Sequence, residues 1–371
     1  MRILLLAAPL LAMLVQSPAR TADWKFRGRL QLDALAAGEP EGRQLARVRR
    51  LFLGVGGGTG DLSWTMDADF SQIGHESIEL RDFLLKWEVS PATRLQIGHL
   101  KHPVTSDNLT SDVDTLFTER SAFASLFAGD RQWGVAVDHM RGDWNIRVAL
   151  FGARGANLLQ DEFEGAAAAA IRMHGDAAPG DPVLHLAVSA LVEDNSDGFR
   201  LSARPENALV ARVLDTGTLM ADHKTVVAAE FGWRNGPWLV QAEGGRLWLK
   251  DAARNGGTPG FTGASVQLGW VITGEQRPYS RRDGVFDSVK PDDPVTEGGA
   301  GAVELGARIT RIDLDEQGIY GGRLTTYGGV ASWFPVPGLR LTADWVHSNS
   351  DHRLFGKRNA DHVTVRGQFE W

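Results

Sequence analysis

The stretch His362-Val-Thr-Val-Arg-Gly-Gln-Phe-Glu-Trp371 alternates in polarity from one residue to the next. Successive side chains of a β-strand point to opposite faces. One face therefore carries Val363, Val365, Gly367, Phe369 and Trp371, and the other carries Thr364, Arg366, Gln368 and Glu370. In a transmembrane β-barrel, apolar side chains face lipid, polar side chains face a wet lumen, and aromatic rings lie at the interface. The stretch therefore predicts a strand of such a barrel.

The same alternation recurs along the chain. Residues 24–34 place Trp24, Phe26 and Leu32 on one face, with charged and amide side chains on the other. Residues 62–70, 144–150, 303–310 and 339–345 read in the same way. Two segments are mixed: Arg47 to Gly57, which has arginine on both faces, and Trp238 to Lys250. Either β-bulges or a lumen face of small residues would explain them, and the sequence does not decide between the two.

The number of strands follows from a constraint on bacterial barrels. We count about 17 candidate strands, but a single-chain barrel needs an even number. Residues 207–214 are the weakest candidate, and removing them leaves about 16 strands, enough for an aqueous channel. The connections alternate between short turns on the periplasmic side and long loops outside. We expect residues 102–130, 276–299 and 350–361 to be such outer loops.

Composition agrees with an all-β exported protein. The chain has 371 residues, no cysteine and a net charge of −7, which argues against non-specific nucleic-acid binding. Met1-Arg2, the apolar residues 3–15 and the small residues around Ala19 are typical of a signal peptide, with cleavage after Ala19 or Ala22. We therefore expect a signal peptide at residues 1–19 and one outer-membrane barrel domain at residues 20–371.

Three parts of the chain resemble the phosphate-selective porin O and P family of Gram-negative outer membranes. The motifs are Gly98-His-Leu-Lys101 with Pro103, Leu109-Thr-Ser111, Thr118-Glu-Arg-Ser121 and Arg131-Gln-Trp-Gly134; Thr273-Gly-Glu275 with Tyr279, Gly284, Phe286, Pro291 and Pro294; and Gly298-Gly-Ala-Gly-Ala302 with Val303-Glu-Leu305 and Ala307-Arg308. The resemblance implies a trimeric 16-stranded barrel, a long inward-folding loop that narrows the pore, and anion selectivity. It also implies that outer-membrane assembly machinery recognises the C-terminal Phe369 and Trp371.

The lining of a pore sets which ions enter it, and arginine suits phosphate because its planar fork matches two oxygens. Alternation directs Lys25, Arg27, Arg29, Arg147, Arg308, Arg340 and Arg366 toward the lumen. Acidic residues point the same way, so the alternative is that these arginines pair with acids and stiffen the wall. We consider that structural role the better interpretation for any single arginine.

The inward loop is where selectivity is expected, yet it departs from an ideal phosphate pore. Between His102 and Asp130 the only basic residue among lysines and arginines is Arg120. The acidic candidates of this constriction loop are Asp107, Asp112, Asp114 and Glu119. Such a loop repels phosphate unless wall arginines dominate, and Glu119 and Arg120 have an alternative role in pinning the loop to the wall.

The sequence leaves three classes of function open. The first is a porin for passive, anion-favouring diffusion of small hydrophilic solutes, with phosphate as a candidate. The second is an outer-membrane barrel enzyme, although no nucleophile motif such as Gly-x-Ser-x-Gly occurs. The third is a secreted β-rich binding protein. We expect no catalytic residues, no cofactor and no metal, because His99 and His102 lie on opposite faces of a strand. The expected partners are outer-membrane lipid, two further copies in a trimer, and small anions.

Overall fold

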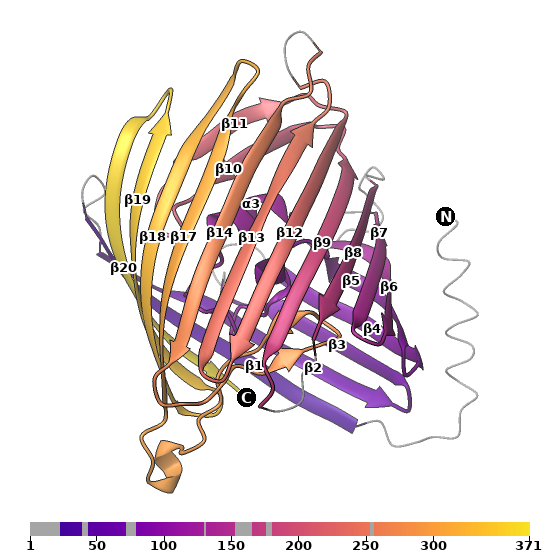
Figure 1. Ribbon diagram of the computed structural model, residues 1–371, viewed down its shortest axis with the longest axis vertical. Helices are drawn as coiled ribbons and strands as arrows, with labels where there is room; N and C mark the ends of the chain where they lie inside the picture. Colours follow the sequence, from indigo (N-terminus) through magenta and orange to yellow (C-terminus); the bar gives the residue numbers. More distant parts are fainter. Residues whose placement is uncertain are drawn as a thin grey trace.

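The computed structural model describes residues 23–38, 44–71, 79–129, 131–152, 165–175, 180–252 and 256–371. The predicted signal peptide lies outside these residues. Sixteen antiparallel strands form one closed barrel (Figure 1). The barrel strands are β1 (Asp23–Ala37), β2 (Gln44–Thr59), β3 (Leu62–Asp69), β4 (Glu79–Ser90), β5 (Thr93–Lys101), β6 (Arg131–Arg141), β7 (Trp144–Phe151), β8 (Ala166–His174), β9 (Val183–Asp194), β12 (His223–Asn235), β13 (Trp238–Leu249), β14 (Gly260–Val271), β17 (Ala302–Glu316), β18 (Ile319–Val336), β19 (Leu339–His352) and β20 (Gly356–Glu370).

The other elements lie in the connections between barrel strands. They are α2 (Ser106–Leu109), α3 (Ala122–Phe127), β10 (Phe199–Ala203), β11 (Leu214–Leu219), β15 (Tyr279–Ser280), β16 (Val285–Phe286) and the 3-10 helix η1 (Val295–Glu297). The prediction of about 16 strands is confirmed, and residues 207–214 stay outside the barrel, as expected. In the part of the chain that the structure describes, no helix combines the length and apolar character needed to cross a membrane.

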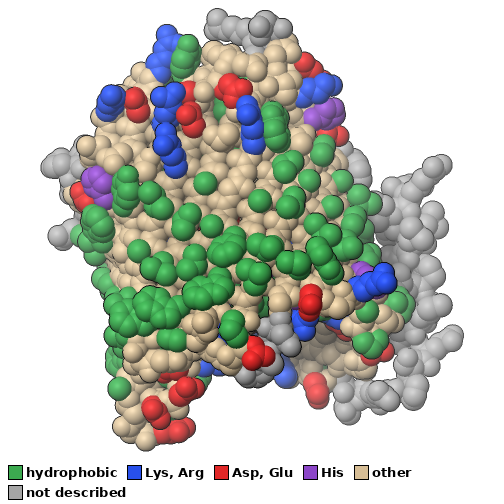
Figure 2. Space-filling model, in the orientation of Figure 1, with side chains coloured by type: hydrophobic (Ala, Val, Ile, Leu, Met, Phe, Trp, Pro, Cys, Tyr) green, Lys and Arg blue, Asp and Glu red, His purple; other side chains and the backbone are tan. Residues whose placement is uncertain are grey.

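The barrel closes where β1 pairs with β20. Arg29 lies opposite Glu370 in this register, and Asp33 lies opposite Arg366. Both strands present alternating apolar residues to the outside, including Leu32, Val365 and Phe369. The outer face is apolar over its middle, and charged side chains gather toward its ends (Figure 2). This surface is what contact with lipid hydrocarbon requires.

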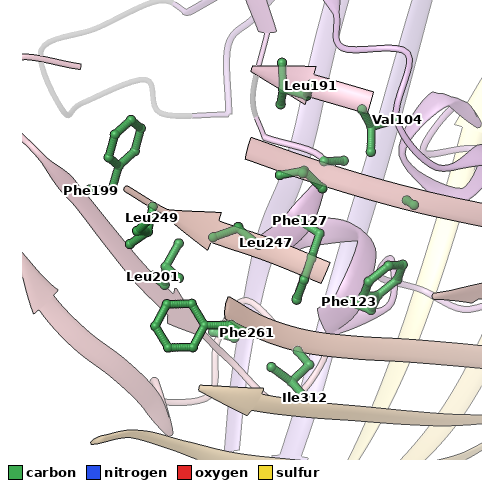
Figure 3. Close-up of a cluster of buried hydrophobic side chains, with 14 of the residues drawn as sticks. Val104, Phe123, Phe127, Leu191, Phe199, Leu201, Leu247, Leu249, Phe261 and Ile312 are labelled. Carbon is green, nitrogen blue, oxygen red and sulfur yellow. The ribbon is translucent and has the colours of Figure 1, made fainter. Parts of the chain in front are cut away.

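The lumen is partly filled by a dry core. Residues 102–129 leave β5 and fold into the barrel, where α3 buries Phe123 and Phe127 completely. These rings pack against apolar side chains from the walls and from β10, among them Leu247 and Phe261 (Figure 3). Their packing is possible because Gly263 on β14 has no side chain: a Cβ there would lie 2.8 Å from Phe123. The loop was predicted to fold inward, and it does.

The predicted side of one long connection is wrong. Residues 272–301 join the end of β14 to the start of β17, at the barrel end that also carries Trp371 and the short turns. We call this the terminal end and the opposite end the loop end. Part of the connection, including β15 and β16, folds into the lumen, because Phe286 packs with Val183 and Leu239 of the wall. Alternation of strand polarity carries no information on which end a connection occupies.

A second predicted loop is also wrong. β19 continues to His352 and β20 begins at Gly356, so the expected loop at residues 350–361 is a tight hairpin. Polar residues on both faces suggested a loop. These strands extend past the apolar band into water, where neither face needs apolar side chains.

Candidate functional site

A cavity of about 250 Å³ lies in the lumen between the inward loop and the wall formed by β1, β2 and β4 to β7. Its cationic lining is Arg29, Arg50, Arg81, Lys86, Lys101, Arg120, Arg131 and Arg147. Its acidic lining is Asp82, Asp112 and Asp283. A site with this excess of cations attracts anions, because low-polarity walls focus the field of the charges.

Two β-bulges place adjacent residues on the lumen side together. Gln31 pairs with Arg50 while Leu32 pairs with Val48, so Arg49 has no counterpart on β1. Both arginines then reach acids of the inward loop, Arg49 to Glu119 and Arg50 to Asp112. This resolves the mixed sequence of Arg47 to Gly57, because a bulge adds one residue and re-aims its side chain.

A second bulge acts in the same way on β4. Asp67 pairs with Asp82 and Ala68 with Leu80, which leaves Arg81 without a counterpart. Arg81 and Asp82 consequently both line the cavity.

Three guanidinium groups surround one buried ring in the cavity wall. The Cζ atoms of Arg29, Arg50 and Arg81 lie 5.1, 5.3 and 5.9 Å from the centroid of Phe52. The negative face of an aromatic ring attracts such cations, which otherwise repel one another. Phe52 therefore holds a local concentration of positive charge that no simple run of arginines in the sequence indicates.

The acids of the inward loop are engaged rather than free. Asp112 binds Arg29 and Arg50, with 2.6 Å between its Oδ2 and Nε of Arg50. Burial alone raises the pKa of Asp112, but the charges of Arg29 and Arg50 outweigh burial and hold it well below its usual range. Glu119 accepts from Arg49 at 2.6 and 2.9 Å and from Arg366 at 3.1 Å.

The remaining two acids also have partners. Asp107 accepts from the backbone N–H of Ser121 at 2.8 Å, and Asp114 accepts from that of Ser288 at 3.0 Å. The expected repulsion of anions by this loop is therefore reduced by ion pairs and hydrogen bonds that the sequence does not reveal.

Arg120 and Lys101 brace the loop from within. Arg120 donates to the carbonyls of Asp107 at 2.8 Å and Thr110 at 2.5 Å. Lys101 donates to the carbonyls of Asn108, Leu109 and Thr110 at 2.7, 3.1 and 3.0 Å. Both cations line the cavity, but their donors are largely used by carbonyls at the end of α2.

Three of the arginines that alternation directs inward lie behind the inward loop. Arg340 donates to the carbonyls of Thr115 and Leu116 at 2.6 and 2.7 Å. Arg308 donates to Glu119 O at 3.0 Å and pairs with Glu206 at 2.8 Å. Arg366 pairs with Asp33. These arginines hold the loop and the wall together and do not line the cavity.

The other cations selected from the sequence have different positions. Arg29 and Arg147 line the cavity, where Arg147 pairs with Asp138. Arg27 pairs with Asp67 near the terminal end, and Lys25 is exposed. Sequence reasoning missed six cations: Arg49, Arg50, Arg81, Lys86, Lys101 and Arg131. The arginines on both faces of residues 47–57 were the available signal for the first two.

The cavity leads toward an opening at the terminal end. A second cavity of about 470 Å³ is lined there by Arg27, Asp67, Gly338, Glu370 and Trp371. Arg29 and Phe52 line both cavities. A route through the lumen therefore runs along the β1–β7 wall and passes Arg29 and Phe52.

The connection of residues 272–301, part of which folds into the lumen from the terminal end, carries a carboxylate that titrates near neutrality. Burial, together with the charges of Asp114 and Asp283, raises the pKa of Asp287 to about 6. Asp287 is therefore charged above pH 6 and neutral below it. Lowering the pH from 7.5 to 5 is expected to remove a negative charge from the segment that also brings Asp283 into the cavity, and therefore to increase the preference for anions. Reversal potentials at the two pH values measure this, and in Asp287→Asn the difference should shrink; an equal difference in that variant would contradict the assignment.

Comparisons with known proteins agree with this architecture. Residues 25–371 match the family model described as phosphate-selective porin O and P. A protein of Caulobacter vibrioides, described only as uncharacterized, is 29% identical over 339 residues, which is 86% of this chain and 67% of that protein. Within the described residues, no three His, Asp or Glu side chains are grouped so as to hold a metal ion.

Solved structures show the same fold at low sequence identity. An anion-selective porin from Comamonas acidovorans has a TM-score of 0.61 at 10% identity, over 94% of this chain and 100% of that one. OmpT of Vibrio cholerae has a TM-score of 0.61 at 9% identity, over 96% and 99%. The channel DcaP of Acinetobacter baumannii has a TM-score of 0.58 at 12% identity, over 94% and 97%.

The family match and these barrels place the protein in the outer membrane of a Gram-negative bacterium, as a channel. Its terminal end is then periplasmic and its loop end extracellular. The predicted resemblance is confirmed over nearly the whole chain: the protein belongs to the phosphate-selective porin O and P family.

Proposed function

We propose that the protein is a porin for passive diffusion of small hydrophilic solutes that favours anions, with phosphate as a candidate. The observation that carries this proposal is the cavity, where eight cationic side chains outnumber three acidic ones. Channels conduct when sites hold ions weakly enough to release them. The carboxylates that pair with Arg29, Arg50 and Arg147 weaken each cation, which favours release over tight binding.

The proposal includes the partners expected from the sequence. Phe369 and Trp371 stack with ring centroids 5.4 Å apart, and both are about half exposed on the outer face. We assign them to contact with lipid and with outer-membrane assembly machinery. A homotrimer is supported by the description of one structural neighbour, OmpT of Vibrio cholerae, as a trimer form.

The test is the reversal potential of purified protein in a planar bilayer with a potassium chloride gradient. We expect the sign of an anion-preferring channel, and added inorganic phosphate should reduce the chloride current. A cation-preferring reversal potential would overturn the anion claim, and unchanged chloride current would overturn phosphate as a solute. Absence of any conductance, in protein whose gel mobility still changes on heating, would favour the enzyme alternative.

A further inference from the structure

Asp283 is the one acidic residue of the cavity lining that comes from the periplasmic segment between β15 and β16. Its Oδ1 lies 2.7 Å from Nη2 of Arg94 on β5 and 3.5 Å from Nη2 of Arg147 on β7. Both arginine side chains are more than nine-tenths buried, whereas the Asp283 side chain is 46% exposed. The carboxylate thus reaches from the open cavity onto two fixed cations.

Arg94 and Arg147 also bind a second acid, which differs from Asp283 in its burial and in the element that carries it. Asp138 on β6 is completely buried, binds both Arg94 and Arg147, and also accepts from Gln96 at 2.6 Å. It belongs to the wall itself. Nη2 of Arg147 makes no hydrogen bond in the described structure and lies 3.5 Å from Oδ1 of Asp283, so its contact with Asp283 is an ion pair alone.

Lys86 adds a third cation at the same place. It lies on β4 opposite Gln96, next to the Glu88–Arg94 pair of the same register. Within the described residues, Lys86 is the only cation of the cavity lining that makes neither a hydrogen bond nor an ion pair. Burial alone raises the pKa of Asp283, but the charges of Arg94, Arg147 and Lys86 outweigh burial and lower it.

The backbone around Asp283 is held independently of its side chain. Arg281 pairs with Asp143 at 3.0 Å, and Arg282 pairs with Glu88 and donates to Pro91 O at 2.6 Å. These contacts tie the segment to the periplasmic turns of the neighbouring strands. The Asp283 carboxylate also accepts from Ser280 Oγ at 3.1 Å, within the same segment. Rotation of the side chain away from the arginines therefore breaks one local hydrogen bond besides the ion pairs, while the segment stays in place.

We propose that Lys86, Arg94 and Arg147 form a binding site for a permeating oxyanion, and that Asp283 is a tethered competitor for it. The proposal rests on the proposed anion route and adds to it a named site and a built-in antagonist. Three cations converge on a cavity, one of them unpaired, and the carboxylate that occupies them is exposed enough to be displaced. An oxyanion with several acceptor oxygens can take over the interactions that the Asp283 carboxylate makes with the arginines, because guanidinium groups bind carboxylates and such oxyanions in the same geometry. By competing for the same cations, the Asp283 carboxylate shortens the time for which the site holds such an anion.

The test uses the full-length protein in planar bilayers with potassium chloride and inorganic phosphate as the probe. Asp283→Asn is expected to lower the phosphate concentration that halves the chloride current by about tenfold. Asp61→Asn is the matched control, because it removes an equal charge from the exposed periplasmic turn between β2 and β3 without touching the three cations or the contacts that hold the segment. It should leave the phosphate dependence as in the wild type.

A second variant keeps the proposal testable if Asp283→Asn assembles poorly. Lys86→Gln alone should raise the half-inhibiting phosphate concentration, and Lys86→Gln added to Asp283→Asn should cancel the gain. Phosphate dependence in Asp283→Asn equal to that of the wild type would overturn the tethered competitor, and a double variant that behaves like Asp283→Asn would overturn the site. The wild-type reversal potential, measured in the same membranes, reports separately on the proposed function.

Discussion

Gly328→Val is expected to raise the single-channel conductance severalfold, because the added side chain occupies the space in which Phe117 of the inward loop packs against the wall. A Cβ at Gly328 on β18 would lie 2.8 Å from Cε1 of Phe117, a ring that is 99% buried beside Leu116 and Val330. Overpacking of this kind typically costs about 1–3 kcal/mol. The barrel strand itself favours a β-branched residue, so the strain should be relieved by displacement of Phe117 and the loop.

The adjacent residue provides the control for this experiment. Gly329 faces the outside of the same strand, and a Cβ there would meet nothing within 4 Å. Gly329→Val should therefore leave conductance unchanged and keep the shift in gel mobility on heating. If both variants conducted like the wild type, Phe117 would not hold the constriction in place.

Arg366→Ala is expected to lower the thermal stability of the barrel more than any other single loss of a lumen charge. Arg366 on β20 binds Asp33 on β1 at 2.6 and 2.8 Å, across the seam that closes the barrel, and both side chains are nearly fully buried. Leaving one partner of a buried ion pair alone costs about 3–5 kcal/mol. Arg366 also reaches Glu119 at 3.1 Å, so the loop loses a contact at the same time.

The temperature at which gel mobility changes in detergent measures this loss. Asp33→Asn combined with Arg366→Gln removes both charges together, and it should recover most of the stability because no unpaired charge stays buried. A single variant as stable as the wild type would show that the seam is held by its backbone hydrogen bonds alone.

Strand polarity was enough to predict the barrel and its approximate strand number. It also indicated that residues 207–214 are the weakest candidate for a barrel strand. It failed at Trp238 to Lys250 for a physical reason: β13 faces the dry lumen core through Leu247 and Leu249, so apolar residues occupy both faces. It also placed residues 276–299 at the wrong end of the barrel, because alternation within strands does not report the end at which a connection lies. The inward path of this segment depends on contacts such as Arg277 with Glu304, at 2.6 Å between Nε and Oε1.

The candidate site was less accessible to sequence reasoning than the fold. Alternation gives the face of a side chain, and Arg308, Arg340 and Arg366 are indeed on the lumen side. It does not say whether a loop covers them there. At a β-bulge the alternation of side chains between the two faces is interrupted. Arg49 and Arg81 are the extra residues of two such bulges, so strict alternation did not assign them to the lumen. Pairing between Asp112 and Arg29 joins residues far apart in the chain, and a single sequence carries no signal of it.

The dry core inside the barrel has an electrical consequence. Phe123 and Phe127 fill the lumen side of β14 and belong to an apolar cluster that reaches Leu100, Ala136 and Ala149 of the cavity lining, so the route along β1 to β7 borders a medium of low dielectric constant. Coulomb interactions weaken in proportion to the dielectric constant, and salt screens buried charges less than exposed ones. The field of Arg29 and Arg50 therefore extends farther into the route than it would in a pore filled with electrolyte. Side chains that never touch an ion thereby strengthen its attraction to the channel.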